Sequence, residues 1–344
     1  MKAVRFHAHG GPEVLRYEDA PDPVPQRGDV LVRVRACALN HLDLWQRRGM
    51  ERVSIPFPHI SGSDIAGEIV SAPVPDLPAG TRVMLQPGLS CGRCAACLAG
   101  ADNTCSDYSV IGYRSDGGYA EFVTAPVPNV IPIPPHIGFF EAAAFPLTFV
   151  TAWHMLLTRA RLQRGETVLV LAAGSGVGQA AVQIARAYGA RVIATAGSQT
   201  KLARAKAIGA DAVINHSTQE IADEVRRMTD KRGVDIVVEH VGRATWEQSV
   251  RSLARGGRLV TCGATTGPAV GIDLRVVFAK QVSLLGSYMG TKAELLSAAR
   301  LFFAGRLQPV VDSVLPLAEA AEAQRRLEER DHFGKLVLEP EGRK

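Results

Sequence analysis

The sequence contains no apolar run long enough to cross a membrane. Its most apolar stretch, residues 139–157, is interrupted by Glu141, Pro146 and His154, so we expect it to be a buried element of a folded domain. The first residues show no secretory signal and alternate apolar with polar positions, which is typical of a strand and a turn. We therefore expect a cytoplasmic protein.

A strong excess of one charge is also absent. The 39 Lys and Arg residues are interspersed with 34 Asp and Glu residues, and the formal net charge is +5. No basic stripe or aromatic-basic face is present, which argues against nucleic-acid binding. At 344 residues the chain is longer than one hydrophobic core usually supports, so we expect two domains.

The first part of the chain, residues 1–130, is predicted to be β-rich. Gly- and Pro-rich turns separate short β-like runs at residues 29–40, 64–70, 81–88 and 119–126. The proline-rich stretch at residues 126–138 is predicted to be a connector at a domain boundary.

From Thr167 onward, apolar strands alternate with helices. Strands are predicted at residues 167–174, 191–197, 211–215, 234–242, 257–264 and 282–287. Helices are predicted between them at residues 179–188, 201–208, 221–229 and 245–253. This alternation predicts right-handed βαβ units and a doubly wound parallel sheet, so the expected fold class is α/β. The segment after Gly286 is expected to return to the first domain.

A glycine-rich loop joins the first of these strands to the first helix. Its pattern, Ala173-x-x-Gly176-x-Gly178, is looser than the strict G-x-G-x-x-G motif. Within a βαβ unit, such a loop lets backbone N–H groups approach a pyrophosphate at the positive end of a helix. We therefore predict a dinucleotide site, against the alternative of a merely structural turn. The predicted cofactor-binding residues of the loop are Gly174, Ser175, Gly176, Val177 and Gly178.

The end of the second strand of this unit carries no carboxylate. NAD-binding proteins place Asp or Glu there to bind the ribose 2′-hydroxyl group, whereas residues 194–198 read ATAGS. Small residues followed by Ser198 and Lys201 can accept a 2′-phosphate, so NADP(H) is favoured over NAD(H). The alternative is that Lys201 is an ordinary solvated helix residue. Gly263, in a later strand, is assigned to the same cofactor site.

Four of the six cysteines lie in one short segment. They are Cys91, Cys94, Cys97 and Cys105, with two, two and seven residues between them. Four thiolates at this spacing can surround one Zn²⁺ ion and leave no open coordination position, so this zinc would be structural. Disulfides are the alternative, which the cytosol disfavours. Cys37 and Cys262 are expected to be small buried residues.

Together these motifs resemble the medium-chain dehydrogenase/reductase superfamily over essentially the whole chain. The matching stretches are residues 10–25, 28–49 and 56–70, the four-cysteine segment, the loop around Gly178 and residues 334–338. The resemblance implies a GroES-like substrate domain (residues 1–130 and 288–344) interrupted by a Rossmann domain (residues 131–287). It also implies an NAD(P)H-dependent oxidoreductase acting on a small molecule. Zinc alcohol dehydrogenases and zinc-free quinone or enone reductases share this fold.

The catalytic-metal positions discriminate between these two groups. The resemblance implies a Cys where this chain has Asn40, a His where it has Ser63, and a further Cys near Leu147. Leu42 stands where alcohol dehydrogenases carry the hydroxyl of their proton relay. Asn, Ser and Leu cannot hold Zn²⁺ tightly. Asn40 and Asp43 are instead similar to the N-x-x-D motif of quinone oxidoreductases, although those proteins usually lack the cysteine segment.

Without a catalytic metal, the charge that develops on the substrate must be stabilised by hydrogen bonds. Hydride addition to a simple ketone leaves a localised alkoxide, whereas addition to a quinone or activated alkene leaves a delocalised anion. We therefore predict NADPH-dependent reduction of a quinone or an activated alkene. Asn40 and His41 would orient the substrate oxygen or the nicotinamide, and Thr151 would lie near the nicotinamide ring. The general acid stays open between His41, bound water and Tyr288.

Two alternatives remain. One is an NAD(P)-dependent alcohol dehydrogenase with an irregular second zinc bound by His41, His59 or Asp64. The other is an NADPH-binding protein without turnover, whose cysteine segment acts as a redox-sensitive clip. Whichever function applies, the apolar strand around residues 282–290 is expected at the edge of the sheet. There it favours pairing of chains into a homodimer or homotetramer.

Overall fold

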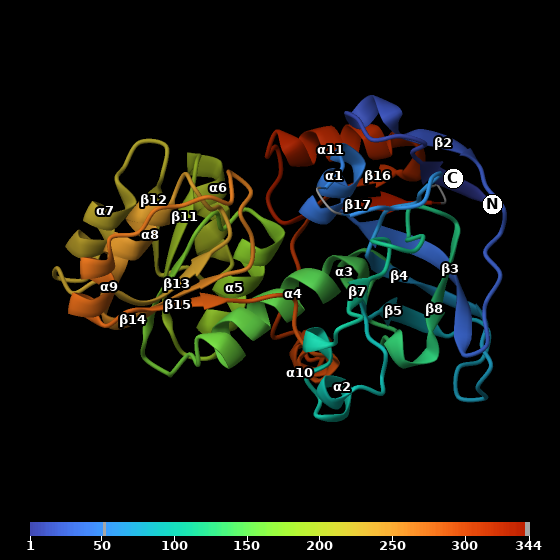
Figure 1. Ribbon diagram of the computed structural model, residues 1–344, viewed down its shortest axis with the longest axis horizontal. Helices are drawn as coiled ribbons and strands as arrows, with labels where there is room; N and C mark the ends of the chain where they lie inside the picture. Colours follow the sequence, from blue (N-terminus) through green and yellow to red (C-terminus); the bar gives the residue numbers. More distant parts are fainter. Residues whose placement is uncertain (51–52, 341–344) are drawn as a thin grey trace. The chain divides into compact units, whose positions relative to one another are not determined.

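The chain folds into two compact units (Figure 1). The computed structural model describes residues 1–50 and 53–340. The first unit comprises residues 1–147, 291–293 and those from 308 onward, and the second comprises residues 148–290 and 294–307. These limits extend the first unit beyond the predicted boundary at residue 131. The reason is that β9 (Val130–Pro132) and α3 (Phe139–Ala144) pack on the sheet of the first unit.

The first unit is built on a seven-stranded sheet in the neighbour order β16-β17-β3-β4-β5-β9, with β8 paired to β3. Its strands are β3 (Asp29–Ala38), β4 (Asp64–Ser71), β5 (Arg82–Leu85), β8 (Phe122–Pro126), β9, β16 (Val311–Pro316) and β17 (Lys335–Glu339). Along β3, Val30, Val32 and Val34 are buried between half-buried neighbours, as the alternating sequence predicts. The β-rich character predicted for this part of the chain is confirmed.

The proline-rich stretch predicted as a connector instead contributes a strand. Residues Val130–Pro132 pair antiparallel with β5, and β9 forms one edge of the sheet. Proline is tolerated there because an edge strand has an N–H side that needs no ladder partner. The prediction was therefore wrong for these residues.

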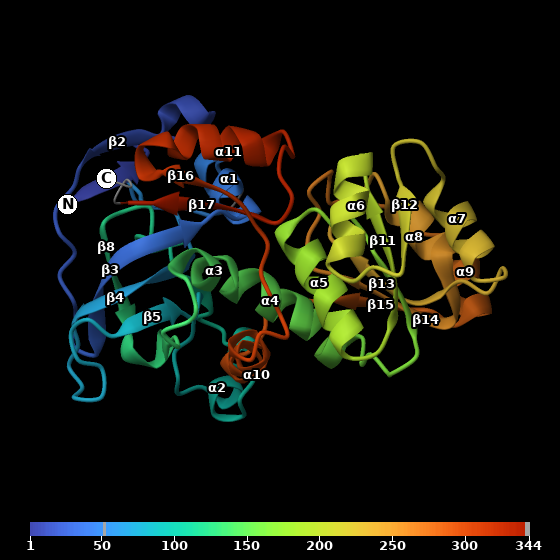
Figure 2. The same cartoon turned by 180° about the vertical axis from the view of Figure 1, so that it is seen from behind.

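Short elements complete the first unit. They are β1 (Lys2–Arg5), η1 (Pro12–Val14), β2 (Arg16–Asp19), α1 (His41–Arg48), β6 (Gly88–Leu89), α2 (Ala95–Leu98), η2 (Asp102–Thr104), β7 (Ser109–Val110), η3 (Val127–Asn129), η5 (Leu317–Glu319) and α11 (Ala320–Glu328). Figure 2 shows α2 in a lobe that projects from the sheet of this unit.

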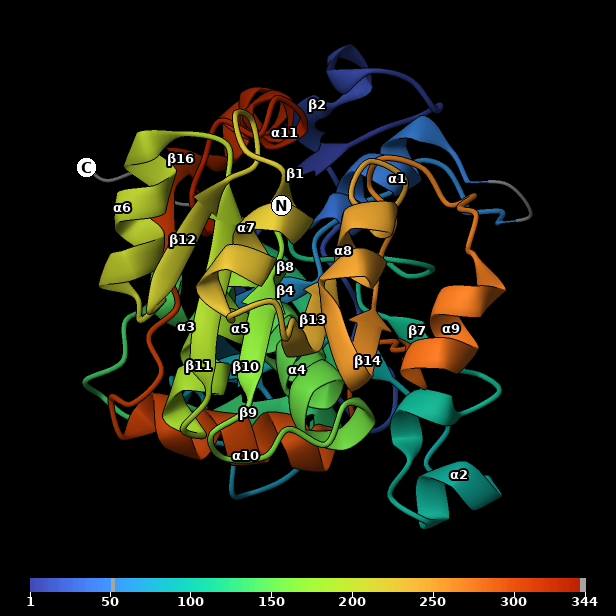
Figure 3. The ribbon, with the colours of Figure 1, turned by 90° about the vertical axis from the view of Figure 1, so that its left-hand side faces the viewer.

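The second unit contains a six-stranded parallel sheet in the order β12-β11-β10-β13-β14-β15. Figure 3 shows the strands from β12 to β14 side by side in this order. Its strands are β10 (Thr167–Val170), β11 (Arg191–Ala196), β12 (Ala212–Asn215), β13 (Val234–Glu239), β14 (Leu253–Thr261) and β15 (Ser283–Gly286). The helices that follow α3 are α4 (Pro146–Trp153), the π-helical turn η4 (His154–Arg159), α5 (Gly176–Ala187), α6 (Gln199–Ala207), α7 (Ile221–Met228), α8 (Trp246–Ser252), α9 (Leu274–Lys280) and α10 (Lys292–Phe303).

This strand order confirms the predicted doubly wound sheet. Helices α5 and α6 lie on one face of the sheet, and α7, α8 and α9 lie on the other (Figure 1). The chain moves outward from β10 to β12 in one direction and from β13 to β15 in the other, so the order reverses between β10 and β13. In open α/β sheets, ligands bind beyond the carboxyl ends of the strands at such a reversal.

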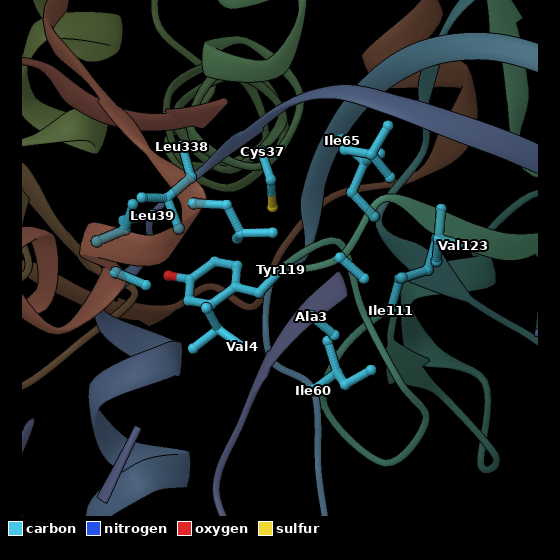
Figure 4. Close-up of a cluster of buried hydrophobic side chains, with 14 of the residues drawn as sticks. Ala3, Val4, Cys37, Leu39, Ile60, Ile65, Ile111, Tyr119, Val123 and Leu338 are labelled. Atoms are coloured by element: carbon cyan, nitrogen blue, oxygen red, sulfur yellow. The ribbon is translucent and has the colours of Figure 1, made fainter. Parts of the chain in front are cut away.

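Each unit has its own apolar core. In the first unit, Val4, Leu39, Ile65 and Leu338 belong to a cluster of buried side chains that includes the fully buried Tyr119 (Figure 4). The apolar stretch at residues 139–157 forms α3, α4 and η4, and most of its apolar side chains are buried. Among the described residues, no helix is long and apolar enough to span a membrane.

Candidate active site

The glycine-rich loop connects β10 to α5 in the second unit. Ser175 is the N-cap of α5, and its Oγ accepts a hydrogen bond from the Gly178 N–H at 2.9 Å. A Cβ atom on Gly178 would lie 2.3 Å from the Ala172 carbonyl oxygen, so only glycine lets the helix start so close to the strand. Gly176 and Val177 are the first residues of α5, where N–H groups lack helical partners. The loop therefore fits a pyrophosphate at a helix N-terminus.

His240 joins the two loops that flank the reversal of strand order. It follows β13, and its Nε2 lies 3.0 Å from the Leu171 carbonyl oxygen and 3.4 Å from Ser175 Oγ. Burial lowers the pKa of His240, so the neutral ring donates from Nε2. Gly263, assigned to the cofactor site, lies beside it, because a Cβ there would be 3.3 Å from the His240 carbonyl oxygen. Sequence reasoning missed His240, although an ionisable residue directly after a buried strand was a usable signal.

At the end of β11, the chain turns into α6 without an acidic side chain. Ser198 is the N-cap of α6, and its Oγ accepts a hydrogen bond from the Lys201 N–H at 3.3 Å. The capping role leaves the Ser198 hydroxyl hydrogen for another acceptor. Lys201 lies in the first turn of α6. The structure thus brings the two predicted 2′-phosphate residues to one helix N-terminus.

Two residues after β12 complete this corner. His216 Nδ1 lies 3.2 Å from Thr195 Oγ1, and the Ser217 hydroxyl donates to the Gly197 carbonyl oxygen at 3.1 Å. A Cβ on Gly197 would be 3.1 Å from both His216 Nε2 and Ser217 Oγ, so these side chains lie directly beside the end of β11. Sequence reasoning missed both, because their proximity depends on the parallel pairing of β11 with β12.

In the first unit, three buried polar side chains form the Asn40–Asp64–Lys335 cluster. Lys335 Nζ donates to Asn40 Oδ1 at 2.6 Å and to Asp64 Oδ2 at 2.9 Å. Asn40 Nδ2 also donates to Asp64 Oδ2, at 3.0 Å. The three residues are 7%, 0% and 2% exposed, respectively. The Leu147 N–H donates to Asp64 Oδ1 at 2.8 Å. Asn40 and Leu147, two of the positions where the resemblance implies zinc ligands, therefore both bind the Asp64 carboxylate.

Lys335 is the residue of this cluster that sequence reasoning did not assign. It is the first residue of β17, which pairs antiparallel with β3 immediately before Asn40. A lysine inside the apolar run FGKLVL was the available signal, since lysine is almost never fully buried unless it is paired. Its partners come from residues far away along the chain, so the sequence does not name them.

Asp43 supports Asn40 from the other side. Its Oδ2 accepts hydrogen bonds from the Asn40 N–H at 2.8 Å and from the Tyr119 hydroxyl at 2.9 Å. Its Oδ1 is buried and has no hydrogen-bond partner within the part of the chain that is described. Burial raises the pKa of Asp43 to about 6 despite these donors. Through these two hydrogen bonds, the Asp43 carboxyl group stabilises the junction between β3 and α1.

The other predicted catalytic residues lie in different environments. His41 is half-buried at the first position of α1, with its ring centroid 6.4 Å from that of Trp45. Thr151 is buried in α4 of the second unit, and its Oγ1 lies 4.0 Å from Met289 Sδ. Tyr288, the third candidate for the general acid, is 58% exposed.

The four clustered cysteines converge around α2 and η2. Their Sγ atoms all lie within 4.8 Å of one another, with Cys91–Cys97 and Cys94–Cys97 separations of 3.9 and 3.6 Å. Sulfur atoms about 2.3 Å from a tetrahedral zinc are about 3.8 Å apart. All four are free cysteines. This donor set fits a structural zinc ion. Cys37 is fully buried, as expected, whereas Cys262 is only partly buried.

Two family models match the chain. An alcohol dehydrogenase GroES-like domain matches residues 26–135, and a zinc-binding dehydrogenase domain matches residues 176–304. The quinone oxidoreductase of Mus musculus is 34% identical over 334 residues, which cover 94% of this chain and 92% of that protein. The chain belongs to the medium-chain dehydrogenase/reductase family.

Other members of the family resemble the chain to a similar extent. An NAD-dependent alcohol dehydrogenase of Sulfurisphaera tokodaii is 32% identical, with 99% of this chain and 100% of that protein covered. The crystal structure of an NAD-dependent alcohol dehydrogenase superposes with a TM-score of 0.96 at 47% identity, covering 99% of this chain and 100% of the other.

Membership in the medium-chain dehydrogenase/reductase family has three consequences. The first and second units correspond to a GroES-like domain and a Rossmann domain. The protein is an NAD(P)H-dependent oxidoreductase. This conclusion argues against the alternative of an NADPH-binding protein without turnover. The relatives include both reductases and alcohol dehydrogenases, so the family alone does not select the substrate.

Proposed function

We propose that the protein catalyses NADPH-dependent reduction of a quinone or an activated alkene without a catalytic metal. The observation that carries this proposal is the Asn40–Asp64–Lys335 cluster. It lies where the resemblance implies the catalytic zinc ligands, and its one carboxylate is already paired with a buried ammonium group. The quinone oxidoreductase relatives, such as the Mus musculus protein, support the same reaction class.

The donor chemistry of this cluster is poorly suited to Zn²⁺. Zinc sites in proteins use thiolate, imidazole and carboxylate ligands, and this cluster offers a single carboxylate. Lys335 Nζ lies 2.6 Å from Asn40 Oδ1 and 2.9 Å from Asp64 Oδ2, so a dication bound to the same oxygens would be repelled by the ammonium charge. Hydrogen bonds are therefore the means left to stabilise a developing oxyanion. They are better matched to a delocalised anion than to an alkoxide.

The residues of the chain then have distinct roles. NADPH, when bound, supplies the hydride, and a proton completes the two-electron reduction of the substrate. The loop at Gly178 and the helix start at Ser175 would hold the pyrophosphate. Asn40 and His41 would orient the substrate oxygen or the nicotinamide, and Thr151 would lie near the nicotinamide ring. The proton would come from His41, from bound water or from Tyr288.

Preference for NADPH is supported by the corner at the end of β11. Among the described residues, positions 194–198 at the end of β11 carry no carboxylate that would repel a 2′-phosphate. Ser198 is the N-cap of α6, Lys201 lies in its first turn, and His216 Nδ1 lies 3.2 Å from Thr195 Oγ1 at the end of β11.

The second candidate is an NAD(H)-dependent alcohol dehydrogenase. The 47% identical solved structure of an NAD-dependent alcohol dehydrogenase and the four-cysteine cluster favour it. Under this candidate, a second zinc would be bound near His41, His59 or Asp64. His59 is nevertheless buried with its Nε2 3.1 Å from the Gly112 carbonyl oxygen, and burial lowers its pKa.

Initial rates and metal content separate these candidates. NADPH and NADH are each tested with an enone, a quinone and an alcohol–aldehyde pair, and zinc per chain is measured by mass spectrometry of the metal. The proposal predicts one zinc per chain, preference for NADPH, and turnover of the quinone or enone. Two zinc ions per chain, with alcohol turnover that a chelator abolishes, would establish the second candidate instead.

A second copy of the chain is the proposed partner of the sheet edge. Strand β15 ends the six-stranded sheet, and Leu284 on it is 38% exposed. On the neighbouring helix α9, Leu274 and Phe278 are each 68% exposed. An apolar, unpaired edge invites strand pairing, and two copies can satisfy each other. A monomeric mass by light scattering would contradict this homodimer.

A further inference from the structure

Lys335 determines how the Asn40 side-chain amide is oriented. An ammonium group only donates hydrogen bonds and a carboxylate only accepts them. The Asn40 oxygen must therefore face Lys335 Nζ, at 2.6 Å, and the Asn40 nitrogen must face Asp64 Oδ2, at 3.0 Å. A flipped amide would place the Asn40 nitrogen against Lys335 Nζ, which is also a donor, and the Asn40 oxygen against Asp64 Oδ2, which is also an acceptor. The cluster thus fixes which end of the amide carries the hydrogens.

This arrangement leaves one Asn40 hydrogen for another acceptor. The amide nitrogen carries two hydrogens, and Asp64 accepts one of them. Within the described parts of the chain, no acceptor takes the second, although Asn40 is only 7% exposed. A buried amide with an unused donor is suited to bind an oxygen of a ligand, because leaving the donor unpaired costs free energy.

The charge of Lys335 also changes the strength of that donor. A cation bound at the amide oxygen draws electron density from the nitrogen and polarises its N–H bonds. Because the cluster is shielded from solvent, this effect is screened less than it would be in water. Aimed at an oxygen where negative charge develops, such a donor stabilises the transition state more than the ground state.

We propose that Lys335 is a positioning residue that orients and polarises the Asn40 amide, so that Asn40 donates to the substrate oxygen that becomes negative during reduction. This inference rests on the catalytic role of Asn40 in the proposed function. Lys335 itself does not touch the substrate, and its ammonium charge acts through the amide. It thereby supplies, through one hydrogen bond, part of the charge stabilisation that a metal supplies in zinc-dependent relatives.

A double-mutant cycle tests this coupling. Asn40→Ala is expected to lower kcat by roughly 100- to 1,000-fold, as for loss of an oxyanion donor. Lys335→Met is expected to lower kcat by roughly 10- to 100-fold with little change in KM, because the polarised donor acts mainly in the transition state. In the Asn40→Ala background, Lys335→Met should lower kcat by less than about threefold. Equal loss in both backgrounds would overturn the proposal.

Three further variants separate coupling from simple instability. Lys335→Arg keeps the buried cation and should retain kcat within about tenfold of the wild type. If Lys335→Met does not fold because Asp64 is left unpaired, the cycle is repeated with Lys335→Met/Asp64→Asn, which removes both charges together. Arg326→Met is the matched control, since it removes a half-buried cation that pairs with Asp312 in the same unit, away from Asn40. It should lower stability but not kcat.

The cycle also distinguishes this inference from the proposed function. If the wild type turns over only an alcohol–aldehyde pair, the proposed substrate class fails, and the cycle is measured with that pair. Coupling between Lys335 and Asn40 would then still support the positioning role. Conversely, quinone or enone turnover with no coupling supports the proposed function and overturns the role of Lys335.

Discussion

The glycine-rich loop of the second unit and the Asn40–Asp64–Lys335 cluster of the first unit are built in opposite ways. The loop is one continuous segment, and Ser175 caps the helix through an N–H three residues away. In the cluster, Lys335 is 295 residues from Asn40 and 271 from Asp64 along the chain. A local site is specified by backbone conformation, whereas the cluster is specified by strand pairing and by the chemistry of buried partners.

For cofactor binding, the largest effect is expected from breaking the glycine-rich loop. Gly178→Ala would place a Cβ 2.3 Å from the Ala172 carbonyl oxygen, which a rigid backbone cannot avoid without moving the start of α5. Overpacking of this kind costs roughly 3 kcal/mol, so the dissociation constant for NADPH should rise about 100-fold. Calorimetric titration with NADPH measures this.

Gly271→Ala is the matched control in the same unit. A Cβ there meets nothing within 4 Å, and NADPH affinity should be unchanged. Undiminished NADPH binding by Gly178→Ala would mean that the close approach of helix and strand does not shape the cofactor site.

A smaller effect is expected at the corner that combines local and distant residues. Lys201→Ala and His216→Ala should each weaken NADPH binding by roughly fivefold to tenfold, because each would remove one solvent-screened contact to the proposed 2′-phosphate. NADH binding should change little, since it lacks that phosphate. The comparison of KM for the two cofactors measures the preference.

Lys206→Ala on the same helix provides the control, because Lys206 is exposed in the last turn of α6. A wild type that prefers NADH, or equal losses for both cofactors, would remove the assignment of this corner to a 2′-phosphate.

The smallest effect concerns the carboxyl group beside the cluster. The pKa of Asp43 is raised to about 6 in the folded chain, so the folded state binds a proton more readily than the unfolded state. The stability from this group is complete below about pH 4 and is lost as the pH rises through about 6. Between pH 5 and pH 7 the loss should be roughly 1 kcal/mol.

Chemical denaturation at both pH values measures this difference, and Asp43→Asn should reduce it. An identical pH dependence in the variant would show that Asp43 does not ionise in this range in the folded chain.

Much of the second unit could be predicted because its signals are local. The alternation of apolar strands with helices indicates the parallel sheet, and glycines between a strand and a helix indicate the dinucleotide loop. The error at residues 130–132 has a tertiary cause, since a proline-rich segment becomes a strand only because the edge of β5 is available. His216 and His240 escaped prediction for the same reason, because each reaches the candidate site only through a neighbouring strand or loop.

By itself, the sequence determined the fold class, the cysteine cluster and the position of Asn40 at the end of a predicted strand. These follow from spacing and periodicity, which act over a few residues. Only the tertiary structure decided that Lys335 reaches Asn40 and Asp64, because β17 must first pair with β3. A buried charge needs an opposite charge nearby, and the tertiary fold decides which residue supplies it. The spacing of residues along the sequence does not identify that partner.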